Sequence, residues 1–140
     1  MLRAVLDANV LLSALIRPQG SPGQILRRWL EDRAFALITS PTILAEVRRA
    51  LDYPRVRKYL VGSDEDLDLW VASLGLIAEP VEGRLRLRVA EDPDDDKYIA
   101  AAVEGFAQFV VTGDAHLLSL KDYEGIRIVT PRAFIALLEG

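Results

Sequence analysis

The chain has 140 residues, of which 51% are hydrophobic and 27% charged, and its formal net charge is −4. This length and composition predict one globular domain spanning residues 1–140 and exclude a mainly disordered chain. Cysteine is absent and histidine occurs once, which excludes disulfides, thiolate nucleophiles and zinc sites built from cysteine or several histidines.

No apolar run is long enough to cross a bilayer. The first residues resemble a strand and meet a charge at Asp7, without the long apolar stretch of a signal peptide. We therefore expect no membrane association and a cytoplasmic location. Because the net charge is acidic, a basic surface that attracts a substrate must be local.

Strand-like and helix-like patterns alternate through the first third of the chain. The pairs Ser21-Pro22 and Ser40-Pro41 each combine a favoured N-cap residue with proline at the first helical position. Each is followed by apolar residues at helical spacing. The predicted elements are a strand at residues 3–6, a helix at 9–16, a helix from Pro22, a strand at 35–39 and a helix from Pro41 to about Leu51.

The alternation continues to the end of the chain. Helices are predicted from Pro54, from Ser63 to near Gly75, from Pro93 to Val103, at residues 115–120 and from Pro131; strands are predicted at 76–78, 109–112 and 126–129, with 82–89 as a loop or an extended edge. Strands that alternate with helices imply right-handed crossovers and a parallel sheet layered by helices. The predicted fold class is α/β.

Four acidic residues follow predicted strands directly or lie on the next helix: Asp7, Glu46, Asp96 and Asp114. Loops after parallel strands converge on one edge of the sheet, so these carboxylates can meet and bind a divalent metal. Each alone has an ordinary explanation, because Asp7 and Asp114 suit helix caps and Glu46 suits an ion pair with a neighbouring arginine. Four together favour a functional site.

Asp96 is the acid least explained by an ordinary role. It ends an acidic run that begins at Glu91, and the other acids of that run suit the positive end of a helix dipole. The positions three, four and seven residues after Asp96 form the inward apolar stripe of the helix, so Asp96 is predicted to be buried. A buried carboxylate requires a metal, a basic partner or a proton. Lys97 lies elsewhere on the helical wheel, which favours a metal.

The residue types and motifs in the chain also limit the kinds of reaction that such a site could catalyse. Carboxylates without nitrogen or sulfur ligands select Mg²⁺ or Mn²⁺, and such sites most often act on phosphate. No Gly-x-Ser-x-Gly, Walker A or Gly-x-Gly-x-x-Gly motif follows any predicted strand. Asn9 suits a metal ligand, an orienting partner for Asp7 or a turn, and Gly113 suggests a tight turn or a close approach of the backbone to a ligand.

Four motifs occur in order along nearly the whole chain. They are Val5-Leu6-Asp7-Ala8-Asn9-Val10-Leu11, then Ser40-Pro41-Thr42 leading to Glu46, then Asp92-Pro93-Asp94-Asp95-Asp96 with Ile99-Ala100-Ala101, and then Val111-Thr112-Gly113-Asp114. In this order and spacing they resemble the PIN-domain ribonucleases, and more narrowly the prokaryotic group that are toxins of toxin–antitoxin systems.

The resemblance implies a three-layer α/β/α sandwich around a parallel sheet of about five strands. It also implies a cytoplasmic endoribonuclease toxin that depends on Mg²⁺ or Mn²⁺, cuts RNA, forms a homodimer and is masked by an antitoxin protein. Carried over by position, the catalytic acids would be Asp7, Glu46, Asp96 and Asp114, the metal ligands Asp7, Asp96 and Asp114, and the supporting residues Asn9, Thr112 and Asp92. Many relatives have Thr or Ser where this chain has Ala8.

An RNA substrate requires positive charge near the acids. Arginine and lysine cluster at residues 27–28, 48–49, 55–58 and 84–88, although arginines on solvated helix faces are common. We favour Arg48 and Arg49 as substrate-binding residues, because they share a predicted helix with Glu46, and residues 55–58, because they follow closely.

Two other functions stay open on the sequence alone. One is a phosphatase of the haloacid-dehalogenase type, with Asp7 as nucleophile and Asp114 in the metal motif. The other is a non-catalytic PIN-like module that binds RNA or protein, for which Ala8 is the sequence support.

Overall fold

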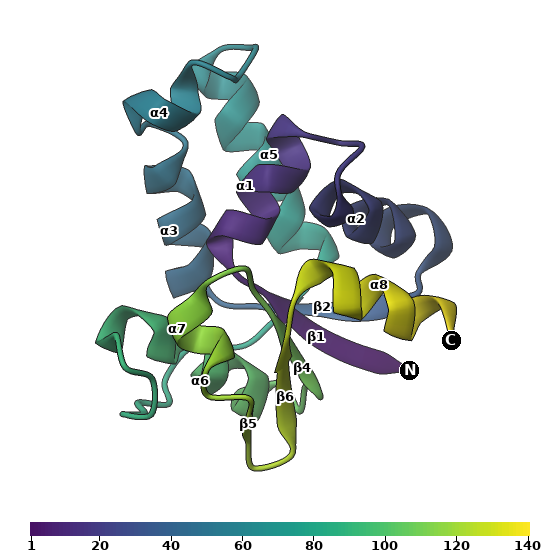
Figure 1. Ribbon diagram of the computed structural model, residues 1–140. Helices are drawn as coiled ribbons and strands as arrows, with labels where there is room; N and C mark the ends of the chain where they lie inside the picture. Colours follow the sequence, from purple (N-terminus) through teal and green to yellow (C-terminus); the bar gives the residue numbers. More distant parts are fainter.

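The computed structural model describes residues 1–140, and its six strands form one sheet in the order β3-β2-β1-β4-β6-β5 (Figure 1). The strands are β1 (Leu2–Leu6), β2 (Phe35–Thr39), β3 (Glu79–Pro80), β4 (Phe109–Val111), β5 (Asp122–Tyr123) and β6 (Ile126–Val129). All neighbours pair in parallel except β5, which pairs antiparallel with β6. The predicted α/β class with a central parallel sheet is confirmed.

Helices cover both faces of the sheet. They are α1 (Ala8–Ile16), α2 (Ser21–Asp32), α3 (Pro41–Ala50), α4 (Pro54–Arg57), α5 (Asp64–Ile77), the 3₁₀ turn η1 (Pro93–Asp95), α6 (Asp96–Glu104), α7 (Ala115–Leu118) and α8 (Pro131–Glu139). Side chains of β1 alternate between two cores: Ala4 and Leu6 pack with α1, α2, α5 and α8, while Val5 packs with α6 and α7. The predicted three layers follow from this alternation. No helix is long and apolar enough to span a membrane.

Several helix ends agree with the sequence pattern. The Ser40 side chain accepts from the Ile43 N–H and caps α3, and Ser63 forms a capping box with Asp66 at the start of α5. One predicted cap is wrong, because α2 begins at Ser21 itself and Gly20 is its N-cap.

The predicted helix end at Gly75 and strand at 76–78 are also wrong. Helix α5 continues to Ile77, and the short β3 follows at Glu79–Pro80. A Cβ added to Gly75 would lie 3.1 Å from Cδ1 of Leu44. Gly75 therefore marks a close contact between α5 and α3 and not a helix end.

Residues 82–89 form an extended segment without strand pairing. Before it, the Val81 N–H donates to the Thr39 carbonyl over 2.8 Å. At its far end, the N–H groups of Val89 and Ala90 donate to Oδ1 of Asp96 over 3.0 and 2.7 Å. The segment is thus fixed to the sheet at one end and to α6 at the other.

Candidate functional site

Asp7, Glu46 and Asp114 meet at the carboxyl edge of the sheet. Asp7 directly follows β1, Asp114 lies shortly after β4, and Glu46 is on α3, the helix that follows β2. Since β1 lies between β2 and β4, the connections after these strands are neighbours. The sequence reasoning that placed these three acids together agrees with this arrangement.

Asp7 is both a helix cap and a member of this acidic group. Its side chain is only 4% exposed, and Oδ1 accepts from the Val10 N–H over 2.8 Å at the start of α1. The Thr112 hydroxyl donates to its Oδ2. Burial raises the pKa of Asp7; hydrogen bonds from Thr112 and Val10 oppose the shift, and the charges of Glu46 and Asp114 add to it.

Thr112 connects two of the acids. Its side chain is fully buried, and its Oγ1 also accepts from the Asp114 N–H over 3.0 Å. Asp114 in turn caps α7, because its Oδ1 accepts from the His116 N–H over 3.1 Å. One hydroxyl therefore fixes Asp7 relative to the turn that carries Asp114.

Asp96 is buried as predicted, but its surroundings differ from those expected. The residue is 8% exposed, and its Oδ1 accepts the two N–H groups of Val89 and Ala90. Two backbone donors compensate the buried charge, so neither a metal nor a lysine is needed to explain it.

Asp95 joins the acidic group instead. Its carboxyl group lies beside that of Asp114, and its pKa rises to about 7, first because of burial and then because of its interactions with Asp114 and Asp92. Sequence reasoning treated Asp95 as a solvated residue at a helix start. The 3₁₀ turn η1 places it toward Asp114, and no periodicity in the sequence indicates that turn.

Glu46 is held by two residues that the sequence reasoning did not select. The Tyr98 hydroxyl donates to Oε2 of Glu46 over 2.6 Å and accepts from the Ala8 N–H over 3.2 Å. Nζ of Lys97 lies 2.7 Å from the same oxygen. Burial and the bond to Glu46 raise the pKa of the Tyr98 hydroxyl, so Tyr98 acts as a neutral donor. Nothing in the sequence pattern singles out Tyr98.

The predicted supporting residues have mixed positions. Asp92 caps η1, accepting from the Asp94 N–H over 3.0 Å, and Asn9 is exposed. Gly113 lies at the surface with an ordinary backbone conformation, and a Cβ added there would meet no atom within 4 Å. The space above Gly113 is therefore open beside Asp114.

The predicted substrate-binding arginines face different surroundings. Arg48 hydrogen-bonds Asp68 and lies 3.3 Å from Asp52, so it is committed to neighbouring acids. Arg49 is exposed and forms no ion pair. Of the two, only Arg49 has a free guanidinium.

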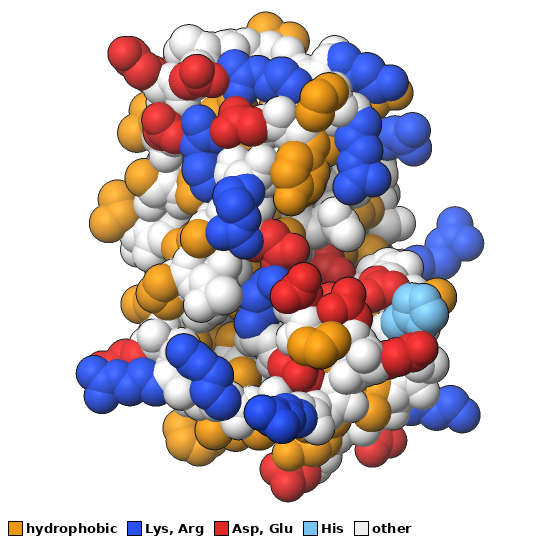
Figure 2. Space-filling view, turned by 90° about the vertical axis from the view of Figure 1, so that its left-hand side faces the viewer, with side chains coloured by type: hydrophobic (Ala, Val, Ile, Leu, Met, Phe, Trp, Pro, Cys, Tyr) orange, Lys and Arg blue, Asp and Glu red, His pale blue; other side chains and the backbone are white.

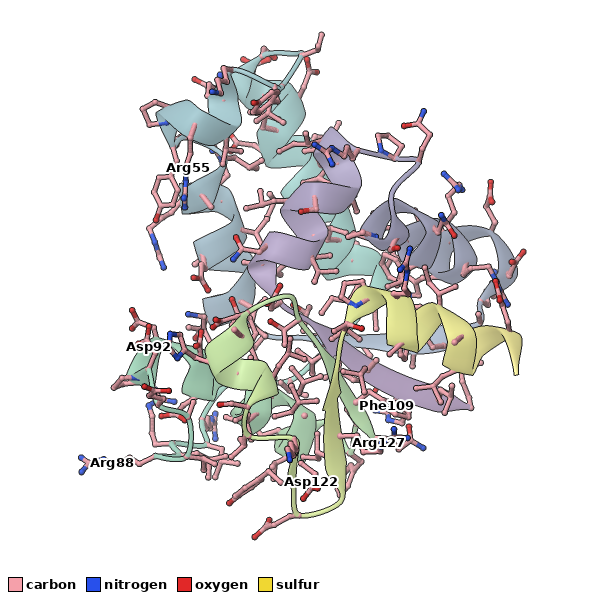
Figure 3. All side chains as sticks on the ribbon, viewed as in Figure 1. Arg55, Arg88, Asp92, Phe109, Asp122 and Arg127 are labelled. Atoms are coloured by element: carbon pink, nitrogen blue, oxygen red, sulfur yellow. The ribbon has the colours of Figure 1, made fainter.

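Charges of opposite sign adjoin on the face that carries the acids. Figure 2 shows the acidic side chains gathered near its centre, with lysine and arginine side chains above and below them. Asp92 lies between Arg55 and Arg88 on the same side of the molecule (Figure 3). His116 lies 3.0 Å from Glu91, and this hydrogen bond raises the pKa of the imidazole.

The donor chemistry of this group fits a hard divalent cation. No three acidic or histidine side chains are already arranged as a metal site. The carboxylates nevertheless crowd one another, since burial and the neighbouring Asp114 raise the pKa of Asp95 to about 7, so that Asp95 holds a proton more tightly than a free aspartate, and the charge of Asp114 contributes to the raised pKa of Asp7. A divalent cation in place of that proton would remove the repulsion, and oxygen is the donor that Mg²⁺ and Mn²⁺ prefer.

Comparisons with known proteins identify relatives of the whole fold. A family model described as a PIN domain matches residues 3–116. The uncharacterized protein MJ1680 of Methanocaldococcus jannaschii is 35% identical over 144 aligned positions, which cover 96% of this chain and 90% of the relative.

Two crystal structures have a similar fold. PAE2754 from Pyrobaculum aerophilum gives a TM-score of 0.63 at 18% identity and covers 99% of this chain and 90% of its own. VapBC2 from Rickettsia felis, bound to a DNA fragment from its promoter, gives 0.60 at 13% identity, with 92% of this chain and 98% of that chain covered. At these identities the two structures support the fold alone.

Proposed function

Because this chain belongs to the PIN-domain family, we propose that it is a metal-dependent endoribonuclease that hydrolyses RNA phosphodiester bonds. The observation that carries the proposal is that Asp7 lies within reach of the charges of Glu46 and Asp114 at one edge of the sheet, with Asp95 beside Asp114. The fourth motif acid, Asp96, we assign to the fold, because its Oδ1 already accepts two backbone N–H groups. Asp95 would take the role of metal ligand that the sequence predicts for Asp96.

The residues divide into ligands and positioning groups. Asp7, Asp95 and Asp114 would hold Mg²⁺ or Mn²⁺, which when bound supplies an activated water and stabilises charge on the phosphate. Thr112 holds Asp7 and the Asp114 turn in register. Glu46, which Tyr98 and Lys97 contact, would accept a proton from the attacking water.

The proposal is tested with purified protein and a labelled RNA. Cleavage should require Mn²⁺ or Mg²⁺ and stop with chelator, and Asp7→Asn should lower the rate by about 100-fold or more. The matched control is Asp122→Asn, because Asp122 is an exposed acid on β5, away from the group (Figure 3). Full activity of Asp7→Asn would overturn the assignment.

We also propose the finer function that the family resemblance implies. The chain would be the cytoplasmic toxin of a toxin–antitoxin pair, would form a homodimer and would be inhibited by an antitoxin that covers the acids. The fold shared with VapBC2 supports this proposal. Induced expression should arrest growth, and Asp7→Asn should restore it; equal toxicity of both chains would contradict the toxin role. No observation favours the phosphatase alternative.

A further inference from the structure

Residues 81–90 run alongside α6 as an extended segment, which we call the arginine strap. The Arg84 N–H donates to Oε1 of Glu104 at the end of α6, over 3.3 Å, and Val89 and Ala90 are bound by Asp96 at its start. The strap therefore runs antiparallel to α6. Its Arg88 end is the one nearer the acids, because Asp95 is adjacent to Asp96.

Side chains of the strap alternate between the core and the solvent. Leu87 and Val89 pack against the core beneath α6, whereas Arg84, Arg86 and Arg88 are all exposed. In an extended chain, alternate residues point to the same side about 6.5 to 7 Å apart. Three exposed arginine side chains thus leave the same side of a segment that is fixed at both ends.

The guanidinium groups of these arginines are available for a ligand. Arg84 pairs only with Glu82, and both side chains are largely exposed. Arg86 donates to backbone carbonyls of Gly83 and Leu85, and Arg88 forms no ion pair and projects away from the protein (Figure 3). Exposed pairs of this kind contribute little and are easily replaced by another anion.

The strap adjoins the acidic group. A hollow of about 300 Å³ separates the strap from α6, and Arg86, Ser40 and Lys97 are among the residues that line it. Lys97 also contacts Glu46, one of the site acids. Arg86 and Lys97 therefore place basic groups between the strap and the site acids, although Asp94, Asp96 and Glu104 line the same hollow.

We propose that the arginine strap binds the sugar-phosphate backbone of single-stranded RNA on one side of the cleavage site. The proposal rests on the proposed nuclease function. Arginine binds phosphate through two parallel hydrogen bonds, and three arginines on one side of an extended segment suit consecutive phosphates of one strand. Because both ends of the strap are fixed, little conformational entropy is lost when RNA binds.

Binding is measured by fluorescence anisotropy with a labelled oligouridine of about 12 nucleotides, in chelator so that no cleavage occurs. The test variant combines Arg84→Gln, Arg86→Gln and Arg88→Gln. The control combines Arg27→Gln, Arg33→Gln and Arg127→Gln, which removes the same charge at other exposed positions. We expect the strap variant to bind at least about 10-fold more weakly than the control, with the slope of log K against log salt shallower by about 2.

Equal affinities and salt slopes of the strap and control variants would overturn the proposal, as would a wild-type chain that binds no RNA. A duplex competitor that displaces the oligouridine as well as single-stranded RNA would overturn the single-strand assignment. Asp96→Ala provides a second arm, since it frees one end of the strap without removing an arginine and should also weaken binding. If the strap variant binds weakly but the wild type cuts no RNA with Mn²⁺, the strap stands and the nuclease function fails.

Discussion

The burial of Asp95 beside Asp114 makes the stability of the metal-free protein depend on pH. Burial, and then Asp114, raises the pKa of Asp95 to about 7 in the folded chain. The folded state therefore binds this proton more tightly than the unfolded state, where the pKa of an aspartate is about 3.9. The stabilisation is complete below about pH 4 and is lost as the pH rises through about 7.

Asp95→Asn should remove this loss. In chelator at pH 8 the variant should have a free energy of unfolding about 1 to 2 kcal/mol above that of the wild type, after allowing for solvent screening. The same variant should lose RNA cleavage. Urea denaturation at pH 5 and pH 8 gives the comparison, with Asp94→Asn as the exposed control. A variant less stable than the wild type at pH 8 would contradict the crowding of Asp95 and Asp114.

Substitution of Asp96 should destabilise the folded protein, whereas substitution of Asp95 should stabilise it at pH 8. Its carboxylate satisfies two backbone donors, so Asp96→Ala leaves Val89 and Ala90 without their partner and should lower the free energy of unfolding by about 2 to 4 kcal/mol. Asp96→Asn keeps one acceptor oxygen and should cost less. Urea denaturation at pH 8 measures both. Equal stability of Asp96→Ala and the wild type would show that the strap is not held by this carboxylate.

Asp95 and Asp96 show which features of the site could be predicted from the sequence and which could not. The helical wheel correctly places Asp96 on the buried face, because burial follows from the spacing of the apolar residues. It cannot reveal that the compensating partners are backbone N–H groups, since every residue carries one. The same limit applies to Tyr98, whose ring belongs to the core while its hydroxyl binds Glu46.

At the scale of elements, prediction succeeds where apolar spacing and caps agree. The long strands follow from buried runs, and α3 begins after Ser40 as the favoured cap predicts. The short strands β3 and β5 contain two residues each and carry no such pattern. β5 exists because Glu124 and Gly125 both have positive φ and turn the chain back onto β6, a conformation that the sequence indicates only at the glycine.

The packing of α2 gives a prediction at this scale. Glycine inside a helix usually costs about 0.5 to 1 kcal/mol relative to alanine, so Gly-to-Ala changes often stabilise. At Gly23 an added Cβ would lie 2.1 Å from the carbonyl oxygen of Pro18, and the backbone there cannot move without shifting the turn before α2. Gly23→Ala should therefore lower the free energy of unfolding by about 1 to 3 kcal/mol.

Gly75→Ala is the matched control for Gly23→Ala. It also lies inside a helix, but its added Cβ would meet only the flexible end of Leu44. Thermal and urea denaturation should show a clear decrease in the free energy of unfolding for Gly23→Ala and only a small change for Gly75→Ala. A stabilised Gly23→Ala protein would mean that the turn at Pro18 does not pack against α2.

At the scale of the whole molecule, the acidic group and an exposed apolar patch lie on opposite edges of the sheet. The acids occupy the carboxyl edge. At the other edge, around the starts of β1 and β2, exposed Met1, Leu30 and Ile77 surround a hollow that Trp29 and Phe35 also line. Exposed apolar groups gathered in this way mark interaction surfaces. A homodimer formed here would leave both acidic groups open to RNA.

This arrangement predicts that a substitution in the apolar patch can abolish dimerisation without changing RNA cleavage. Sedimentation equilibrium should show a dimer of the wild type, and Ile77→Lys should shift it to a monomer, because a charge at the centre of an apolar interface loses its hydration. RNA cleavage per chain should be unchanged, since Ile77 is at the edge opposite the acids. The control is Phe106→Lys, which replaces an exposed apolar side chain outside the patch. A wild type that is monomeric at every concentration, or a Phe106 variant that dissociates as readily, would place the partner surface elsewhere.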